Sequence, residues 1–448
     1  MDVFRARWVV PVAAPPVRDG AIAVRDGRFA YVGPASRAPK SRVHDLGDAL
    51  LLPGLVNTHT HLELTAMRGC LENLPFAEWI GRLQRAKTTI LTRESMLDSA
   101  KLGIAEGLLA GITTYADTCD SGVALEAMRA MGVRGVMYQE VFGPDPDVCD
   151  QAIASLREKL DAQVPNLSSL VRLGVSPHAP YTVSDRLFET TRDLAREMRL
   201  PMAIHIAESA EEETYVRDAT GPFADGHRAR GFAVAPRADT PVALLDRLGL
   251  LSVRPLLIHC VRTREADIHA IAAAGCPIAH CPISNARLGH GIAPLHEWLD
   301  AGITVGLGSD SMASNNRMHM LEEARVAALV QRSGGRSALT ADRALELATM
   351  GGARCLGLAD EVGSIEIGKA ADFAAFPLED LAAVPHADPI ATAVFALGGA
   401  RATTVAVAGD LRVVDGRVLH LDDGLVARVN AVGDALRAFA VSRHDLSE

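Results

Sequence analysis

Two histidines separated by one residue, His59 and His61, are the first feature of the sequence that can do chemistry. They end a short apolar segment with the composition of a β-strand. Residues i and i+2 of an extended chain point to the same side, so both imidazoles can bind one metal ion. A pair of this kind is structural as often as it is functional. The positions of the remaining reactive residues therefore have to show whether this pair is structural or functional.

Further reactive side chains lie on or just after other apolar segments. They are His178, His205, His259, His280 and Asp310. A single histidine is usually a hydrogen-bonded structural residue, but this explanation does not account for a series at consecutive strand ends. In a barrel of parallel strands the carboxyl ends meet at one face, where catalytic groups gather.

The elements that must position these residues alternate between short β-type runs and amphipathic segments from about residue 51 to 355. We expect strands at residues 51–57, 112–117, 134–141, 172–176, 202–206, 255–260, 277–281 and 304–308. The intervening stretches carry helix signals, such as Thr240 before Pro241 and a closing Gly249. The alternation predicts an α/β fold with a (β/α)8 barrel of the TIM type. A doubly wound sheet fits the alternation almost as well, and the reactive strand ends favour the barrel.

Both ends of the chain are rich in strand and turn signals. Asp26-Gly27 between two apolar runs predicts a hairpin, and Gly409-Asp410 repeats the pattern near the other end. We expect a small β-sandwich domain built from both termini. Residues 1–50 form its first part, residues 51–358 form the barrel, and residues 359–448 form its second part and a terminal helix.

Composition excludes several classes of protein. Of the 448 residues 48% are hydrophobic and 22% are charged, which is ordinary for a globular enzyme. A net charge of −10 argues against a nucleic-acid or anionic-membrane binder. No apolar run is long enough to span a membrane, and seven cysteines without a CxxC pair indicate a reducing, cytoplasmic location. The expected partner is a small-molecule substrate, and a homodimer is left open.

Three segments in combination resemble the amidohydrolase superfamily, and within it the cytosine deaminase and chlorohydrolase branch. They are residues 52–61 (LPGLVNTHTH), 205–208 (HIAE) and 308–316 (GSDSMASNN). The resemblance covers nearly the whole chain and implies a hydrolase of non-peptide C–N bonds. It implies His59, His61, His205 and Asp310 as ligands of one divalent metal ion. Imidazoles with one carboxylate suit Zn²⁺ or Fe²⁺ better than Mg²⁺ or Ca²⁺.

Lysine is scarce, and this bears on the number of metal ions. The five lysines are Lys40, Lys87, Lys101, Lys159 and Lys369, and none lies at an expected strand end. Members of the superfamily with two metals need a bridging carboxylated lysine, usually after the fourth strand. This chain has Ser176-Pro177-His178 there. A mononuclear site follows, which disfavours dihydroorotase-like or urease-like chemistry.

The resemblance also implies catalytic roles. A bound metal lowers the pKa of its water toward about 7. Asp310 is expected to take a proton from that water, and His259 to orient it and stabilise the tetrahedral adduct. Glu208 is expected to protonate the ring nitrogen beside the attacked carbon. The following glutamates, at residues 211–213, are expected to face solvent.

The segment after the histidine pair points to a substrate. Residues 61–65 (HLELT) resemble 6-amino-6-deoxyfutalosine deaminases of the alternative menaquinone pathway, which release futalosine and ammonia. Glu63 is expected to bind a ribose hydroxyl or the purine edge, Trp79 to line the pocket, and His178 to contact the substrate. A core position for Trp79 is an equally good interpretation.

Other functions stay open. The same metal site would serve deamination of S-adenosylhomocysteine, methylthioadenosine or guanine, or hydrolysis of a chloro-heterocycle. A further alternative is that the barrel is a non-catalytic scaffold, and the intact ligand set argues against this hypothesis. His290, between two glycines, and His319, between two methionines, depart from the family pattern, so their roles are open.

Overall fold

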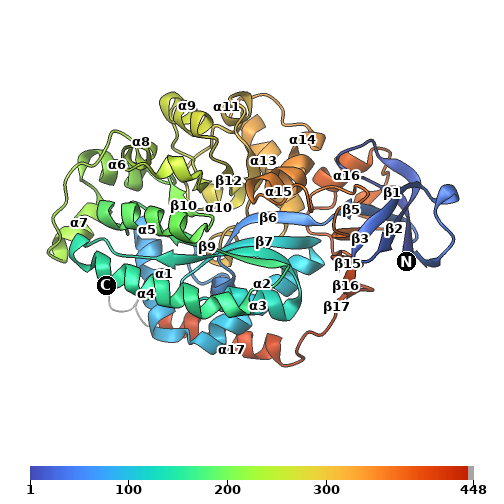
Figure 1. Ribbon diagram of the computed structural model, residues 1–448, viewed down its shortest axis with the longest axis horizontal. Helices are drawn as coiled ribbons and strands as arrows, with labels where there is room; N and C mark the ends of the chain where they lie inside the picture. Colours follow the sequence, from blue (N-terminus) through green and yellow to red (C-terminus); the bar gives the residue numbers. More distant parts are fainter. Residues whose placement is uncertain (442–448) are drawn as a thin grey trace.

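The computed structural model describes residues 1–441 and is an α/β structure (Figure 1). Both ends of the chain contribute to one nine-stranded sheet, ordered β17-β16-β15-β14-β5-β1-β2-β3, with β4 paired to β1. Its strands are β1 (Asp2–Val9), β2 (Val17–Arg25), β3 (Arg28–Pro34), β4 (Arg42–Asp45), β5 (Ala49–Pro53), β14 (Phe373–Pro377), β15 (Thr404–Val407), β16 (Asp410–Val414) and β17 (Arg417–Val418). The β2–β3 and β15–β16 hairpins confirm the turns predicted at both ends.

The middle of the chain forms two four-stranded sheets in which every neighbouring pair is parallel. One contains β6 (Leu55–Thr60), β7 (Ile112–Cys119), β8 (Arg134–Val141) and β9 (Val171–Pro177). The other contains β10 (Ala203–Ile206), β11 (Leu256–His259), β12 (Ile278–His280) and β13 (Val305–Leu307). Isolated parallel bridges join their edges, Val175 to Met202 on one side and Thr60 to Asp310 on the other.

Helices surround these parallel strands (Figure 1). They are α1 (Phe76–Ile90), α2 (Arg93–Leu109), α3 (Val123–Met131), α4 (Cys149–Gln163), α5 (Asp185–Met198), α6 (Ala210–Asp218), α7 (Pro222–Ala229), α8 (Pro241–Arg247), α9 (Glu265–Ala274), α10 (Pro282–Arg287), α11 (Leu295–Asp300), α12 (Met312–Asn315), α13 (Met320–Ser333), α14 (Ala341–Glu346), α15 (Gly352–Cys355), α16 (Pro389–Phe395) and α17 (Leu425–Val441). The predicted cap of α8 is confirmed, because the Thr240 side chain accepts a hydrogen bond from the Ala243 amide. Across residues 1–441 we find no helix with the length and apolar character needed to cross a bilayer.

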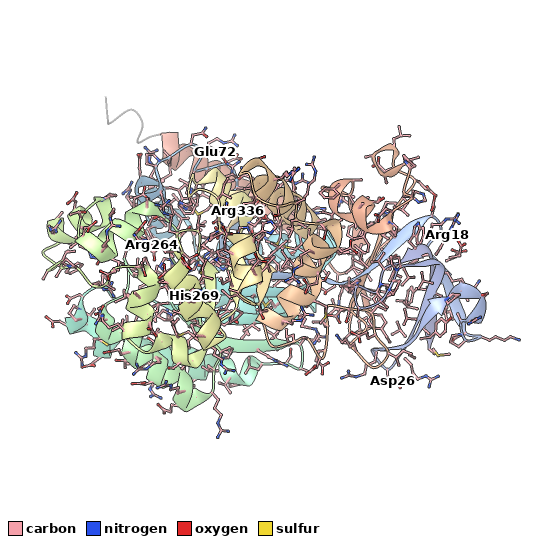
Figure 2. The ribbon with its side chains drawn as sticks, turned by 90° about the horizontal axis from the view of Figure 1, so that it is seen from above. Arg18, Asp26, Glu72, Arg264, His269 and Arg336 are labelled. Carbon is pink, nitrogen blue, oxygen red and sulfur yellow. The ribbon has the colours of Figure 1, made fainter. Side chains whose placement is uncertain are left out.

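The nine-stranded sheet lies at one end of the molecule. Seen from above, Arg18 and Asp26 mark this end, away from Arg264 and His269, which lie just before and within helix α9 (Figure 2). Strand β5 pairs antiparallel with β14, so the two ends of the chain meet inside the sheet. A buried ion pair between Arg134 and Asp372, 3.0 Å long, ties β8 to this sheet. Helix α17 returns from it to pack against α2, where Arg428 pairs with Asp98.

One strand prediction was wrong in its limits. The apolar run at residues 51–57 is divided between β5 and β6, which belong to different sheets. The chain crosses between them at Gly54, where a Cβ atom would lie 2.1 Å from Thr113 Oγ1. Both strands are buried throughout. Since a strand buried on both faces has no polar alternation, the apolar pattern carried no sign of the break.

Candidate metal centre and active site

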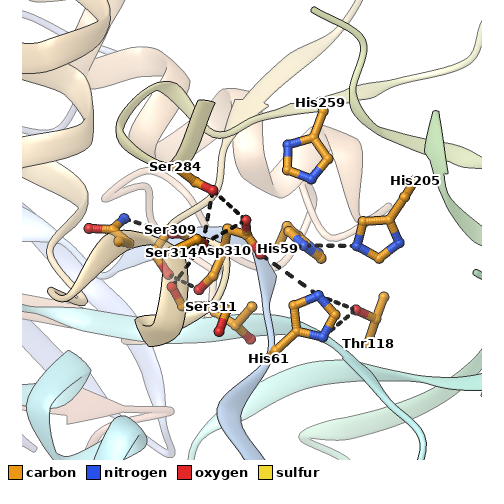
Figure 3. A network of polar contacts seen from close by, with 12 residues as sticks. His59, His61, Thr118, His205, His259, Ser284, Ser309, Asp310, Ser311 and Ser314 are labelled. Atoms are coloured by element: carbon orange, nitrogen blue, oxygen red, sulfur yellow. Dashed lines mark hydrogen bonds and ion pairs between the residues drawn. The ribbon is translucent and has the colours of Figure 1, made fainter. Parts of the chain in front are cut away.

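The predicted metal ligands come together at the carboxyl ends of the parallel strands (Figure 3). The Nε2 atom of His59 lies 3.2 Å from Nε2 of His205 and 3.2 Å from Oδ1 of Asp310. The Nε2 atom of His61 lies 3.7 Å from the same Asp310 oxygen. A tetrahedral ion with bonds of about 2.0–2.1 Å places its ligand atoms about 3.4 Å apart. His59, His61 and His205 form one potential metal group, and His59, His259 and Asp310 form a second that shares His59.

The charge states of these residues also suit a metal. Burial lowers the pKa of His61 to about 4 and the pKa of His205 well below its usual value, so both imidazoles are neutral ligands. Burial raises the pKa of Asp310, but the hydrogen bond with His59 and the neighbouring imidazoles outweigh burial and hold this pKa well below the ordinary range. Three nitrogen lone pairs and one carboxylate are thus available at neutral pH.

Neighbouring groups orient the ligands (Figure 3). Oδ2 of Asp310 accepts hydrogen bonds from the hydroxyls of Ser284 (2.5 Å) and Ser314 (3.0 Å), which leaves Oδ1 facing the histidines. Nδ1 of His205 lies 3.3 Å from the backbone oxygen of His178, so Nε2 is the nitrogen that faces the centre. Such outer contacts fix the ring orientation and the tautomer of a metal-binding histidine.

Glu208 and His259 lie beside this centre. Glu208 is buried, three residues after His205, and its Oε1 lies 3.5 Å from His259 Nε2. His259 Nδ1 is 2.9 Å from Asn285 Oδ1, which turns Nε2 toward Glu208. His259 has a φ of 73° and Asp310 a φ of 59°, in the left-handed region that side chains other than glycine seldom adopt. Strain of this kind is concentrated at functional sites.

The expectation that residues 211–213 face solvent was wrong for two of them. The carboxylate of Glu212 is fully buried and accepts hydrogen bonds from the backbone amides of Ala207 (2.9 Å) and Glu208 (2.8 Å). Glu213 is buried against Arg262 and Arg264. Helix α6 begins directly after Ser209, so Glu212 in its first turn reaches back to the amides of the segment that precedes the helix. Glu212 thereby holds the backbone that carries Glu208.

A cavity adjoins the centre, and all three predicted substrate-contact residues, Glu63, Trp79 and His178, line it. Its wall also contains His61, His205, Glu208, His259 and Asp310. Glu63 is already engaged, since its carboxylate pairs with Lys87 and accepts hydrogen bonds from Ser121. His178 Nδ1 lies 2.8 Å from the Thr182 hydroxyl, which leaves Nε2 for the cavity.

Sequence reasoning missed three residues near the cavity: Lys87, Glu140 and His290. Each left a signal. Lys87 continues the spacing of Trp79 and Leu83, the buried face of α1, where a charge is out of place. Glu140 is an acid near the carboxyl end of the fully buried strand β8. His290 lies between two glycines and departs from the family pattern.

Other histidines and cysteines lie outside the reacting groups. His319 contacts the backbone oxygen of Ala400 at 3.0 Å and does not line the cavity. Cys260 and Cys281 are fully buried. Glu140, His178 and His205 form a further potential metal group, but this group shares His205 with the first set.

A model of the amidohydrolase family matches residues 50–415. The chain belongs to the amidohydrolase family. It is 32% identical over 428 residues to a 5-methylthioadenosine/S-adenosylhomocysteine deaminase of Moorella thermoacetica, covering 92% of this chain and 94% of that one. The resemblance inferred from the three motifs is therefore confirmed, and the chain is an amidohydrolase-type enzyme that hydrolyses C–N bonds.

Solved structures share the fold. An adenosine deaminase from Xanthomonas campestris with bound zinc has a TM-score of 0.85 and 31% identity, covering 98% of each chain. A zinc-bound atrazine chlorohydrolase from Arthrobacter aurescens has a TM-score of 0.83 and 28% identity, covering 97% of this chain and 100% of that one. An aminofutalosine deaminase from Helicobacter pylori, at 19% identity and a TM-score of 0.81 over 92% of this chain and 100% of that one, shows the fold alone. The family and the ligand geometry together imply a divalent metal ion.

Proposed function

We propose that this enzyme is a metal-dependent hydrolytic deaminase of a 6-aminopurine nucleoside. The observation that carries the proposal is the position of Glu208, whose carboxylate faces the same cavity as the metal ligands and lies beside His259. Hydrolytic removal of an amino group from a purine needs an activated water and a group that carries a proton to the ring. The deaminase names of the relatives support the same reaction class.

The proposed ligands are His59, His61, His205 and Asp310, and the proposed catalytic residues are Glu208, His259 and Asp310. These four ligands would hold a divalent metal ion, Zn²⁺ or Fe²⁺, which when bound would supply an activated water at neutral pH. Glu208 and Asp310 then transfer protons, and His259 orients the water.

Glu208 is a carboxylate in the free enzyme. Burial raises its pKa, but the charges of His259 and His290 outweigh this and lower the pKa below its usual value. Glu208 therefore takes the first proton of the attacking water and delivers it to the ring nitrogen beside the attacked carbon. Asp310 takes the second proton as the carbonyl forms and passes it to the leaving amine. The atoms balance, since water and the amino compound become the oxo compound and ammonia.

His259 orients the water and stabilises the oxygen of the tetrahedral adduct. Its contact with Asn285 fixes the ring, so Nε2 keeps its direction during the reaction. The walls of the cavity include Phe76, Trp79 and Leu83 of α1, which exclude water from one side of the substrate. We propose that Trp79, Glu63 and His178 contact the nucleoside.

The predicted substrate remains 6-amino-6-deoxyfutalosine, on the basis of the HLELT segment at residues 61–65. The names of the relatives favour a second candidate, methylthioadenosine or S-adenosylhomocysteine. Assays of the purified, metal-loaded enzyme separate the candidates. The compounds to assay are these three, together with adenosine, guanine and a chloro-triazine. We expect loss of adenine absorbance and stoichiometric ammonia with one of the adenine nucleosides. Inactivity toward all of them, with turnover of guanine or a chloro-triazine, contradicts the proposal.

We also infer that the two parallel sheets close into one (β/α)8 barrel. The bridges at Val175–Met202 and Thr60–Asp310 support this, because they connect both pairs of free edges. Three further statements stay predictions from the sequence: the β-sandwich, the cytoplasmic location, and the domain limits at residues 1–50, 51–358 and 359–448. Whether the enzyme forms a homodimer stays open.

A further inference from the structure

One part of the cavity wall is charged and has no role in the chemistry described above. It consists of Glu63, Lys87 and Glu140, which come from the 3-10 segment Leu62–Met67, helix α1 and strand β8. Lys87 is the one lysine or arginine on this wall among the described residues. Two acids and one base thus face the space that a substrate enters.

The first acid and the base neutralise each other. Glu63 is 1% exposed in its side chain and forms an ion pair with Lys87, whose side chain is 14% exposed. Ser121 also donates to Glu63, and the Cys119 thiol lies 3.1 Å from the same carboxylate. The carboxylate of Glu63 is therefore paired within the protein, and the charge of Lys87 is balanced.

Glu140 differs from Glu63, because one oxygen of its carboxyl group lacks a hydrogen-bond partner among the described residues. It is 4% exposed, and its Oε1 has no hydrogen-bond partner within residues 1–441. Burial raises the pKa of this carboxyl well above its usual value. A carboxyl group offers acceptor positions and, when it carries a proton, one O–H donor. Buried polar atoms are nearly always paired in proteins, so an unpaired one on a cavity wall indicates a ligand group.

We propose that Glu140, beside Lys87, binds a hydroxyl group of the substrate and selects a sugar-bearing substrate over its deoxy counterpart. The inference rests on the proposed function and names the part of the nucleoside that this wall recognises. A hydroxyl both donates and accepts, as the carboxyl and the ammonium group require. An anionic group finds no unbalanced positive charge here, and an apolar group leaves Oε1 unpaired.

The test compares adenosine with 2′-deoxyadenosine and 3′-deoxyadenosine as substrates of the metal-loaded enzyme. We expect the wild type to prefer adenosine to one of the two deoxy compounds by about tenfold or more in kcat/KM, because a site built to pair a hydroxyl rejects the analogue that lacks it. Glu140→Ala should lower kcat/KM for adenosine by about the same factor and leave the rejected deoxy compound within about threefold. The preference then disappears.

Two further variants keep the experiment decisive. Glu140→Gln has the same shape and both a donor and an acceptor, so it should retain part of the preference. If Glu140→Ala does not fold, the Gln variant must still shift the ratio of the two substrates. Glu78→Gln, on the exposed face of α1, should leave the ratio unchanged.

Two results overturn the inference alone: equal turnover of all three nucleosides by the wild type, or an unchanged preference in the folded Glu140 variants. Absence of turnover of every nucleoside by the metal-loaded wild type contradicts the proposed function itself, and this inference with it.

Discussion

The Nε2 atom of His290 lies 3.2 Å from Oε1 of Glu208, and both side chains are almost completely buried, at 2% and 5% exposure. His259 reaches the same oxygen from another strand end at 3.5 Å. Two imidazoles therefore lie against the same oxygen of the carboxylate. Gly289 and Gly291, with φ values of 73° and 104°, shape the loop that presents His290. Phe76 of α1 packs its ring edge-on against this imidazole.

His290→Gln should lower kcat by about 10- to 100-fold and change KM by less than about threefold. The reason is that Glu208 loses one of the two groups that position it, and misplacement of a catalytic group by about 1 Å can cost about a hundredfold. Steady-state kinetics on the active nucleoside measure both constants. His319→Gln is the matched control, since this buried histidine lies away from the cavity. A normal kcat for His290→Gln would show that His259 alone positions Glu208.

Glu208→Gln should bind metal normally and lose about a hundredfold or more in kcat. The amide keeps the shape of the side chain but cannot carry a proton to the ring. Metal analysis and ammonia release measure the two properties separately. The neighbouring Glu211→Gln, on the half-exposed side of α6, should behave as wild type. Turnover above about a tenth of the wild-type rate would remove Glu208 from the mechanism.

Asp310→Asn should reduce both metal content and activity. The carboxylate is the one anionic ligand of the set, and its replacement removes the charge that balances the cation. We expect at least about a tenfold weaker affinity for Zn²⁺, measured by competition with a chromogenic chelator. Asp300→Asn at the exposed end of α11 serves as the control. Retention of full metal content and full turnover would contradict the assignment of Asp310.

Removal of metal with a chelator should abolish deamination and lower the melting temperature. A ligand that binds only the folded state stabilises it in proportion to the logarithm of its concentration over Kd. Addition of one equivalent of Zn²⁺ or Fe²⁺ should restore both activity and stability. Full activity of a preparation with less than about a tenth of an equivalent of metal would contradict the mononuclear metal site.

Glu212 predicts a pH dependence of stability. Burial raises its pKa from 4.5 to about 8 in the folded protein. Between these values the unfolded chain has lost the proton that the folded chain keeps, so this group lowers the free energy of unfolding by up to about 1.4 kcal/mol per pH unit as pH rises. In Glu212→Gln this contribution is absent. Denaturant titrations should therefore show the stability of the variant relative to wild type increasing from pH 5 to pH 8, and a constant difference would contradict the raised pKa.

Much of the metal site was predictable because its signals are local. The His59–His61 spacing places two imidazoles on one side of a strand whatever surrounds it. Parallel strands direct their carboxyl ends to one face, so His205 and Asp310 could be placed at that face from their positions after apolar runs, and the family resemblance implied that both are ligands. In the structure, Nε2 of His59 lies 3.2 Å from Nε2 of His205 and 3.2 Å from Oδ1 of Asp310.

The sequence by itself determined the α/β class, the alternation of strands and helices, and the chemical character of the ligands. Only the tertiary structure decided which charged side chains are buried and what they meet. Glu212 and Glu213 look alike in the sequence, yet one holds backbone amides and the other pairs with arginines. Lys87 and Glu140 are 53 positions apart and meet only because α1 and β8 pack at the same cavity. Burial and long-range electrostatics depend on this packing, and local spacing contains no information about it.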